Sequence, residues 1–300
     1  MDTAAACIAF TLSTLVLGCG GRPAPVEPTT PREDEPVGVP PDEGPAVDAA
    51  VDDTTDPAAD DEPAPPPRLL CIVDAYPDAV TRAFVRDGAW RVVFADGRES
   101  VWNDGRDKTP EERLDEPDLE DMMAESYPAG RDPGPVGEDV EPGRVRVSML
   151  FDNAYGGSER VVRADLVEIP WPGGGHVRMS SRNGAADALR RVIASLDGLD
   201  EAARACLAPR IGSFSYRQIR GTERLSPHAY GIAIDLNVGC GEYWRWQEPF
   251  EGEWRNRMPR AVVDAFEAQG FAWGGRWYHY DTFHFEYRPE LFVPACRGGD

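Results

Sequence analysis

The sequence predicts an α+β fold built on an antiparallel sheet. Strand-like segments do not alternate regularly with helical ones, as they would in a fold of parallel strands and crossover helices. Asp96-Gly97 lies between two strand-like segments, which is the signature of a tight antiparallel hairpin. Two other segments, 185–196 and 259–269, carry apolar residues at helical spacing. Together these observations favour a mixed fold with local strand pairing.

Short apolar or alternating segments are predicted to form the strands. The segments 89–94 and 98–102 flank the hairpin turn. The other predicted strands are 145–151, 164–169, 212–219, 231–238 and 284–287.

Each predicted helix has one apolar stripe and a recognisable end. The helix over 185–196 repeats leucine, valine and isoleucine at intervals of three and four residues, and Gly198 follows it as a natural stop. The helix over 259–269 has Pro259 in its first turn and Gly270 at its end. Each stripe is expected to be buried against the rest of the fold.

The chain is long enough for a folded core but is strongly acidic. It has 300 residues, of which 41% are hydrophobic, and a net charge of −22. This charge argues against nucleic-acid binding, which needs a basic face to displace phosphate counterions. It also gives no reason to expect docking on anionic lipid. The only long apolar run, residues 4–17, is too short to span a bilayer, so a polytopic membrane protein is excluded.

The N-terminus has the pattern of an export signal. Gly18 and Cys19 follow the apolar run, and a small residue before a cysteine resembles the bacterial lipoprotein signal. This resemblance implies cleavage before Cys19 and lipidation of its thiol. No basic residue precedes the apolar run, which departs from the usual signal pattern, and an ordinary export signal is the alternative. We expect residues 1–19 to direct export and a lipid anchor to hold the protein in the cell envelope, at the outer membrane, in the periplasm or on the surface.

An acidic, proline-rich segment follows the signal. Residues 20–67 contain 13 prolines, no aromatic residue, and 13 acidic residues against two arginines. Such a segment cannot bury enough apolar surface to offset the entropy lost on ordering. Proline and like-charge repulsion keep it extended. We expect a disordered tether, or a tail without a role of its own, ahead of a folded domain of residues 68–300.

The cysteines are consistent with an exported protein. Cys7 lies in the signal and Cys19 is the lipidation site, which leaves an even number for the folded domain. Two disulfides are expected, and three pairings remain open. No Cys-x-x-Cys occurs, so a cysteine zinc knuckle is not expected. The cysteines available for pairing are Cys71, Cys206, Cys240 and Cys296.

A histidine and an aspartate lie in an unusual context around a glycine turn. From Gly231 onward the sequence alternates, so that Asp235 points away from the core. A carboxylate within an apolar strand is costly to bury unless it is paired or bound to a metal. Gly231 allows a sharp turn that brings His228 to Asp235. With His284 from a later strand, they supply three zinc ligands and leave the fourth tetrahedral position open for water.

A second segment adds a carboxylate to this candidate site. Phe283 and Phe285 alternate about His284, so the rings are expected to be buried while the imidazole faces the site. Asp281 lies three residues before His284, and a bend between them would bring its carboxylate close to the metal without ligating it. That is the position of a general base. Each residue alone is better explained as structural, but their joint occurrence favours a site.

These residues form two motifs with a family resemblance. Ser-x-His-x-x-Gly-x-Ala-x-Asp begins at Ser226, and Asp-x-x-His-Phe begins at Asp281. Together they resemble the D-alanyl-D-alanine carboxypeptidase family of zinc metallopeptidases, which also contains L-alanyl-D-glutamate endopeptidases. The segments around Arg217 and at Trp273-Gly274-Gly275 also resemble that family. The resemblance covers roughly residues 115–293.

The resemblance implies a role for each motif residue and a fold. Asp281 would be the general base, and Arg217 would polarise the scissile carbonyl and stabilise the oxyanion, because a guanidinium keeps its charge. Ser226 would bind substrate or orient a ligand. The implied fold is a small α+β domain with a central antiparallel sheet, helices on one face and zinc on the other. The implied zinc ligands are His228, Asp235 and His284.

The sequence therefore predicts an exported zinc peptidase. Its substrate would be a peptidoglycan stem peptide, cut as by a D,D-carboxypeptidase or by an L-Ala-D-Glu-type endopeptidase. The alternative is a zinc-bearing, non-catalytic cell-wall binding module, since a signalling domain of the same fold keeps the metal. Asp281 and Arg217 favour the enzyme, because a pure binding module needs neither. No Gly-x-Ser-x-Gly motif supports a serine hydrolase.

Overall fold

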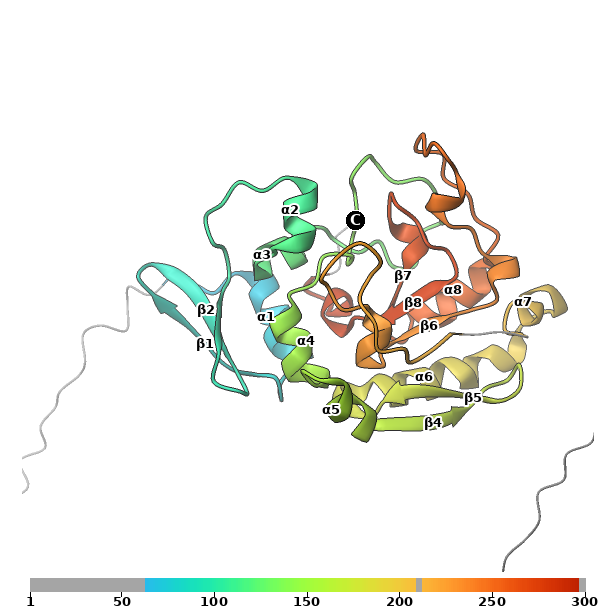
Figure 1. Cartoon of the computed structure of the whole chain (residues 1–300), viewed down its shortest axis with the longest axis horizontal. Helices are drawn as coiled ribbons and strands as arrows, with labels where there is room; N and C mark the ends of the chain where they lie inside the picture. Colours follow the sequence, from blue (N-terminus) through green and yellow to red (C-terminus); the bar gives the residue numbers. More distant parts are fainter. Residues whose placement is uncertain (1–62, 209–211, 297–300) are drawn as a thin grey trace, which may run out of the picture. The chain divides into compact units, whose positions relative to one another are not determined.

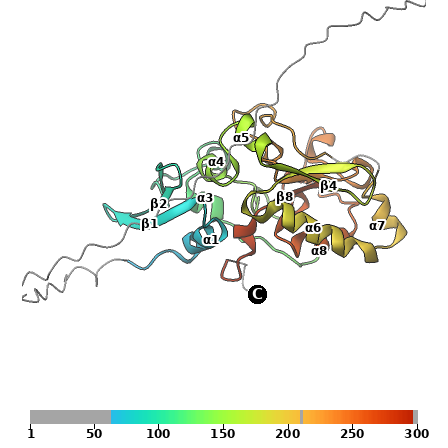
Figure 2. The ribbon, with the colours of Figure 1, turned by 90° about the horizontal axis from the view of Figure 1, so that it is seen from below.

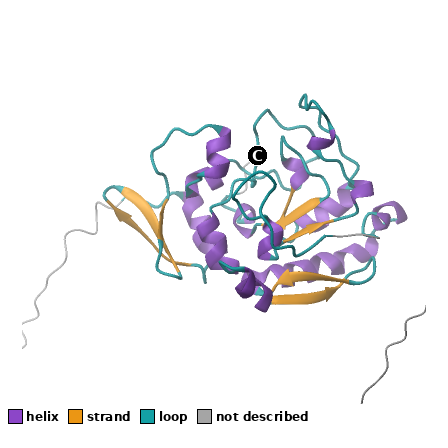
Figure 3. Cartoon of the chain, viewed as in Figure 1, coloured by secondary structure: helices purple, strands orange, loops and turns teal. Residues whose placement is uncertain are grey.

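The computed structural model describes residues 63–208 and 212–296. Within these residues, short helices are interspersed with three small antiparallel sheets (Figure 1, Figure 3). The predicted α+β class is confirmed, although the strands form separate small sheets rather than one central sheet. The predicted signal, the lipidation site at Cys19 and nearly all of the tether lie outside the described residues and stay predictions.

The first sheet follows directly after the first helix. That helix, α1 (Pro67–Ala75), begins close to the predicted start of the folded domain and has proline in its first turn. β2 (Ala89–Phe94) and β3 (Glu99–Val101) pair on either side of Asp96-Gly97, so the predicted hairpin is confirmed. β1 (Val80–Arg86), which was not predicted, pairs with the other edge of β2.

Two short helices follow, and each begins with a capping box. Thr109 caps α2 (Pro110–Asp115) and Asp118 caps α3 (Leu119–Met123), and in both helices the third residue returns a hydrogen bond to the cap. Neither helix was predicted, because five or six residues hold too few apolar positions to establish a helical period.

The strand predicted over residues 145–151 is wrong. Ser148–Tyr155 forms the helix α4 instead. Its buried residues include Leu150, Phe151 and Ala154, and the spacing of one and four residues places them on one face of a helix. The segment resembled a strand because its first four residues, Val145 to Ser148, alternate between apolar and polar side chains, which is the pattern of a half-buried strand.

A two-stranded sheet lies next to α5 (Glu159–Ala164) in the sequence. β4 (Leu166–Pro170) confirms most of the strand predicted over 164–169, and it pairs antiparallel with the unpredicted β5 (His176–Ser180). His176 is the first residue of β5, and the three glycines before it form the connection between the two strands.

The two predicted long helices are confirmed. They are α6 (Ala185–Ser195) and α8 (Arg260–Glu267). α6 lies along the β4–β5 hairpin in Figure 1, and the short α7 (Glu201–Ala205) follows it, capped by Asp200. Among the described residues, none of the helices combines the length and apolar character needed to cross a bilayer.

The third sheet carries the predicted site. Its strands lie in the order β6 (Ala233–Asp235), β8 (His284–Tyr287), β7 (Phe271–Trp273), and both neighbouring pairs are antiparallel. β8 has its predicted range, whereas the strand predicted over 231–238 is reduced to β6 and β7 was not predicted. The central strand of the sheet is therefore the one that contains His284.

The strand predicted over residues 212–219 is also wrong. This segment makes only single bridges, between Gly212 and Asp235 and between Gln218 and Leu225. The second bridge closes a turn in which the amide of Thr222 donates to the carbonyl of Ile219 at 3.0 Å. The segment therefore folds back on itself instead of extending along the sheet.

Helix α8 covers one face of the third sheet. Phe266 of α8 stacks on Phe285 of β8, with ring centroids 4.2 Å apart. Because side chains alternate along a strand, His284 and Glu286 point to the face opposite Phe285. Asp235 of β6 is the direct register partner of His284. The candidate site residues of this sheet thus lie away from the helix.

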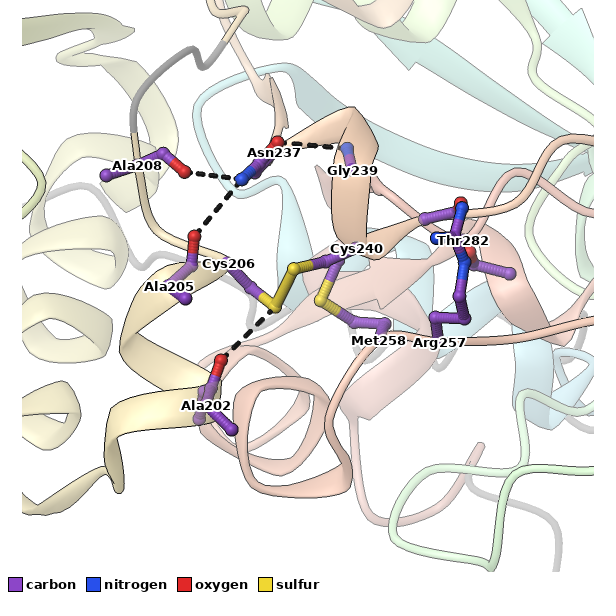
Figure 4. Close-up of a disulfide and its surroundings, with 12 residues drawn as sticks. Ala202, Ala205, Cys206, Ala208, Asn237, Gly239, Cys240, Arg257, Met258 and Thr282 are labelled. Carbon is purple, nitrogen blue, oxygen red and sulfur yellow. Dashed lines mark hydrogen bonds between the residues drawn. A yellow bond between two sulfur atoms is a disulfide. The ribbon is translucent and has the colours of Figure 1, made fainter.

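Two disulfides hold distant parts of the chain together and answer the question of pairing that the sequence left open. Cys71 pairs with Cys296, and Cys206 pairs with Cys240. The first joins α1 to the C-terminal segment, which lies beside α1 in Figure 2. The second joins the end of α7 to the turn after β6 (Figure 4).

Hydrogen bonds beside the second disulfide fix the segment that follows Asp235. The side-chain amide of Asn237 donates to the carbonyls of Ala205 at 3.1 Å and Ala208 at 2.5 Å. Its oxygen accepts the backbone amide of Gly239 at 2.9 Å (Figure 4). The strand carrying Asp235 is therefore anchored just beyond the candidate site.

Candidate metal centre and active site

His228 lies in a short 3₁₀ helix, η3 (Pro227–Tyr230), whose ends are set by motif residues. The hydroxyl of Ser226 accepts the backbone N–H of His228 at 3.4 Å, as a helix N-cap does. Gly231 ends η3 with a φ of 69°, and a Cβ there would lie 2.5 Å from a methyl carbon of Leu166. The chain can therefore turn back into β6, as the motif predicted.

The imidazole of His228 is oriented by a backbone carbonyl. Its Nδ1 lies 2.7 Å from the carbonyl oxygen of Ser213, which can only accept, so Nδ1 carries the hydrogen. Its Nε2 is buried, has no hydrogen-bond partner in the described chain, and lies 3.1 Å from Oδ1 of Asp235. A lone pair and a carboxylate oxygen at this distance repel each other unless a cation or a proton lies between them.

Asp235 and His284 face each other across the β6–β8 pair. Their register places the two residues directly opposite each other, and Nδ1 of His284 lies 2.9 Å from Oδ1 of Asp235. One carboxylate oxygen thus stands between two imidazoles, whose ring centroids are 5.2 Å apart. The strand pairing brings together residues that are 49 positions apart in the sequence.

The three predicted ligands form a group that could hold a metal ion. Their ligand atoms all lie within 4.8 Å of one another. Two imidazole nitrogens and one carboxylate oxygen form a donor set that zinc accepts in catalytic sites. The unpartnered Nε2 of His228 gives independent support, because it is a buried acceptor directed at the carboxylate. The residues present therefore fit a zinc ion.

The electrostatics of the group favour a cation at its centre. Burial alone would raise the pKa of Asp235, but the two neighbouring imidazoles outweigh it and hold the pKa below its ordinary value. Burial would lower the pKa of His284, but its carboxylate neighbours, Asp235 and Glu286, raise it to about 10. A metal ion would replace the proton that this arrangement attracts.

Glu286 completes the surroundings of His284 and was not predicted. Its Oε2 accepts from Nε2 of His284 at 3.1 Å. Arg146 donates to both carboxylate oxygens, and Arg288 donates to Oε1 at 2.9 Å. Burial opposes ionisation of Glu286, but Arg146, His284 and Arg288 together hold its pKa below the ordinary value. A buried, ionised carboxylate therefore holds the imidazole of His284 from the side away from Asp235.

Asp281 lies at the predicted bend before β8. A turn covers residues 282 and 283, and the amide of His284 donates to the carbonyl of Asp281 at 3.2 Å. Gly274 lets the Trp-Gly-Gly segment approach closely, since a Cβ there would lie 2.5 Å from the carbonyl oxygen of Asp281. Burial raises the pKa of Asp281 to about 7; the charge of His284 opposes this shift and Asp235 supports it.

The predicted site residues line one cavity of about 200 Å³. Its walls contain the three candidate ligands together with Asp281, Ser226 and Arg217. The carboxylate of Asp281 has a buried oxygen, Oδ1, without a hydrogen-bond partner in the described chain. All residues singled out for the chemistry therefore share one cavity, although Arg217 reaches it from a segment, 212–219, that is not the predicted strand.

Six arginines also line this cavity, although the chain as a whole has a net charge of −22. Arg144 and Arg146 are paired with the buried carboxylates of Glu141 and Glu286, and Arg224 is paired with Asp115. Within the described residues the remaining three form no ion pair. These unpaired cations are Arg217, Arg220 and Arg245.

Aromatic side chains and a third histidine form another part of the wall. Trp244 and Trp277 line the cavity, together with Tyr243 and His279. His279 is held by the buried Glu141, with Nδ1 2.5 Å from Oε1, and its ring packs edge-on against Trp244 at 4.6 Å between centroids. The side chain is thus fixed at the edge of the site.

Comparison with known protein families supports the same reading of the site. The family model described as D-alanyl-D-alanine carboxypeptidase matches residues 220–287. The family resemblance is confirmed over this segment. The match supports a peptidase, and it includes all three candidate ligands and Asp281, whereas Arg217 lies just before it. No curated protein and no solved structure matches the chain.

Sequence reasoning missed the groups that orient the two imidazoles. Glu286 follows His284 by two residues, so strand alternation could have indicated that the two share a face. The carbonyl of Ser213 has no sequence signal, because every residue carries one. The arginines of the cavity come from three separate segments, and nothing in their local sequence indicates that they meet.

Proposed function

We propose that the protein is a zinc-dependent peptidase that hydrolyses a peptide bond in peptidoglycan stem peptides. It would act as a D,D-carboxypeptidase or as an L-Ala-D-Glu-type endopeptidase. The observation that carries this proposal is the convergence of a His-Asp-His group and an unpartnered buried carboxylate in one cavity. The family match over residues 220–287 supports the peptidase activity.

His228, Asp235 and His284 would hold the metal. Zinc would supply Lewis acidity there, because it polarises a carbonyl and makes water a nucleophile at neutral pH. The carbonyl of Ser213 fixes the tautomer of His228 so that Nε2 is free to bind. Ser226, which caps η3, would contribute by orienting His228 and by facing the substrate from the cavity wall.

Asp281 would act as the general base. It takes a proton from the attacking water and later returns it to the leaving amine. Its unpartnered Oδ1 is free to accept that proton, and its raised pKa brings its basicity closer to neutral pH than that of an ordinary aspartate. Asp281 lines the same cavity as the three candidate ligands and is not one of them, which is the arrangement that a general base needs.

Arg217 would stabilise the negative charge that develops on the carbonyl oxygen. Its guanidinium forms no ion pair within the described residues, so its donors are available to substrate. The other unpaired cations of the cavity, Arg220 and Arg245, suit a substrate that carries carboxylates. Stem peptides have such carboxylates, so the charge of the cavity supports this class of substrate.

Digestion of purified peptidoglycan with the zinc-loaded protein tests the proposal. Mass spectrometry of the soluble products should reveal release of D-alanine or cleavage between L-alanine and D-glutamate. A chelator should abolish the release, and added zinc should restore it. Intact stem peptides after prolonged incubation with zinc-loaded protein would contradict the proposed function.

We further propose that the protein is exported and anchored in the cell envelope by a lipid on Cys19. The two disulfides of the folded part support an oxidising compartment. Cell-associated wild-type protein should partition into the detergent phase, and Cys19→Ser protein should remain in the aqueous phase. Cys7→Ser, a change within the predicted signal, is the matched control and should partition as the wild type does. Wild-type protein that stays aqueous, with a mature N-terminus other than residue 19, would exclude the anchor.

A further inference from the structure

A buried network of alternating charges lies behind His284. Glu286 binds Nε2 of His284 through Oε2, and it also accepts from Arg146 and Arg288. Arg288 in turn donates to Glu290 at 2.5 Å. Arg288 and both glutamates have no exposed surface, and the side chain of Arg146 is 12% exposed. The network therefore places several charges out of water, which is costly unless each one has partners.

The sheet provides the space that this network needs. Glu286 lies on the central strand β8, and its register partners are Ala233 on β6 and Ala272 on β7. Both neighbours are alanines, which have the smallest side chain of any residue except glycine. Larger residues at either position would occupy the face on which the carboxylate meets its arginines. The sequence on all three strands is thus compatible with a buried glutamate at this point.

We infer that Glu286 is a positioning residue for His284, and that Arg146 holds Glu286 in place for that role. The inference rests on the proposed zinc site. By accepting the hydrogen of Nε2, Glu286 fixes the tautomer in which Nδ1 has a free lone pair, and it orients the ring so that Nδ1 faces Asp235. The carboxylate also makes the imidazole a stronger donor to a metal.

Arg146 has a second property that a purely structural cation would not need. It donates to both oxygens of Glu286 from Nε and Nη2, so it holds the carboxylate in one orientation. It also lines the cavity, and its guanidinium lies 6.0 Å from the ring centroid of Trp277. Arg146 lies just before α4 and outside the family match at 220–287. A segment that the family model does not cover therefore contributes to the organisation of the site.

The experiment compares two buried glutamates of the same network. Glu286→Gln keeps the shape of the side chain but removes the charge that faces His284, whereas Glu290→Gln removes a charge that faces Arg288 without touching His284. Zinc affinity is measured by competition with a chelator on the full-length protein. Thermal unfolding of the metal-free proteins shows that each variant is folded. We expect zinc binding to weaken about 10–100-fold in Glu286→Gln and to stay near wild type in Glu290→Gln.

Equal zinc affinity in folded Glu286→Gln and wild type would overturn the inference. An equal loss in both glutamate variants would also overturn it, because it would point to a general effect of the buried charges. If Glu286→Gln does not fold, Arg146→Gln decides the matter: zinc affinity should fall about tenfold, and an unchanged affinity overturns the inference. A wild-type protein that binds no zinc would contradict the proposed function itself, which is a separate outcome.

Discussion

His228→Ala and His284→Ala proteins should each lose most of their zinc. The wild type should carry about one zinc ion per chain, held by three protein ligands. Removing one imidazole leaves one nitrogen and one carboxylate at the site, and the half-buried Asp235 then keeps only one of its two imidazole neighbours. The two protein ligands that remain should hold the ion too weakly to compete with a chelator. Peptidase activity should disappear together with the metal, because the proposed chemistry depends on it.

His176→Ala is the matched control for these variants. His176 is an exposed histidine at the start of β5 and lies outside the cavity. Its replacement should leave zinc content and activity at wild-type levels, which excludes loss of zinc from adventitious surface histidines. Elemental analysis of dialysed protein gives the metal content directly. Full zinc in both His228→Ala and His284→Ala would show that these residues are not the ligands.

More of the candidate site than of the fold could be predicted from the sequence, because the site residues lie in short motifs with strict local geometry. The turn at Gly231 and the bend after Asp281 each follow from a few residues. Strand alternation then predicted that Asp235 and His284 point away from the core, and the strand register shows that they are direct partners on neighbouring strands. None of these steps needs a knowledge of the whole architecture.

The errors in the fold came from segments whose sequence supports more than one structure. The apolar run before Tyr155 has the composition of a strand but forms α4, because its burial follows a helical spacing. The segment 212–219 alternates like a strand, yet a turn closed by the Gln218–Leu225 bridge takes it out of the sheet. In both cases tertiary contacts decide between two local structures of similar preference.

The residues behind the site could not be predicted for a different reason. The role of Glu286 can be recognised only when it is known that Arg146, 140 residues earlier in the sequence, donates hydrogen bonds to its carboxylate. Similarly, the disulfide between Cys71 and Cys296 joins residues 225 positions apart. Such long-range partners leave no periodic signal in the sequence. The site therefore depends on a larger part of the chain than the segment that matches the peptidase family, 220–287.

Asp281→Asn protein should keep its zinc but lose most of its turnover. Asparagine preserves the size and shape of the side chain and removes its basicity, and Asp281 is not one of the three candidate ligands. Loss of a positioned acid–base group typically lowers the rate by about 10²–10⁴-fold. Because the group acts in the chemical step, the loss should appear in kcat rather than in KM. Steady-state kinetics on a defined stem peptide, together with metal analysis, measure both quantities.

Asp187→Asn provides the control, because Asp187 lies exposed on α6 and pairs only with its neighbour Arg190 in the described chain. It should have wild-type zinc content and turnover. Zinc-loaded Asp281→Asn that cleaves stem peptide at the wild-type rate would assign the base to another residue, and His279 would then be the first alternative, since it lines the same cavity. If neither the wild type nor the variant cleaves any peptidoglycan fragment while both bind zinc, the site is a metal-bearing binding module. The unpartnered oxygen of Asp281 would then serve to bind a ligand rather than to accept a proton from water.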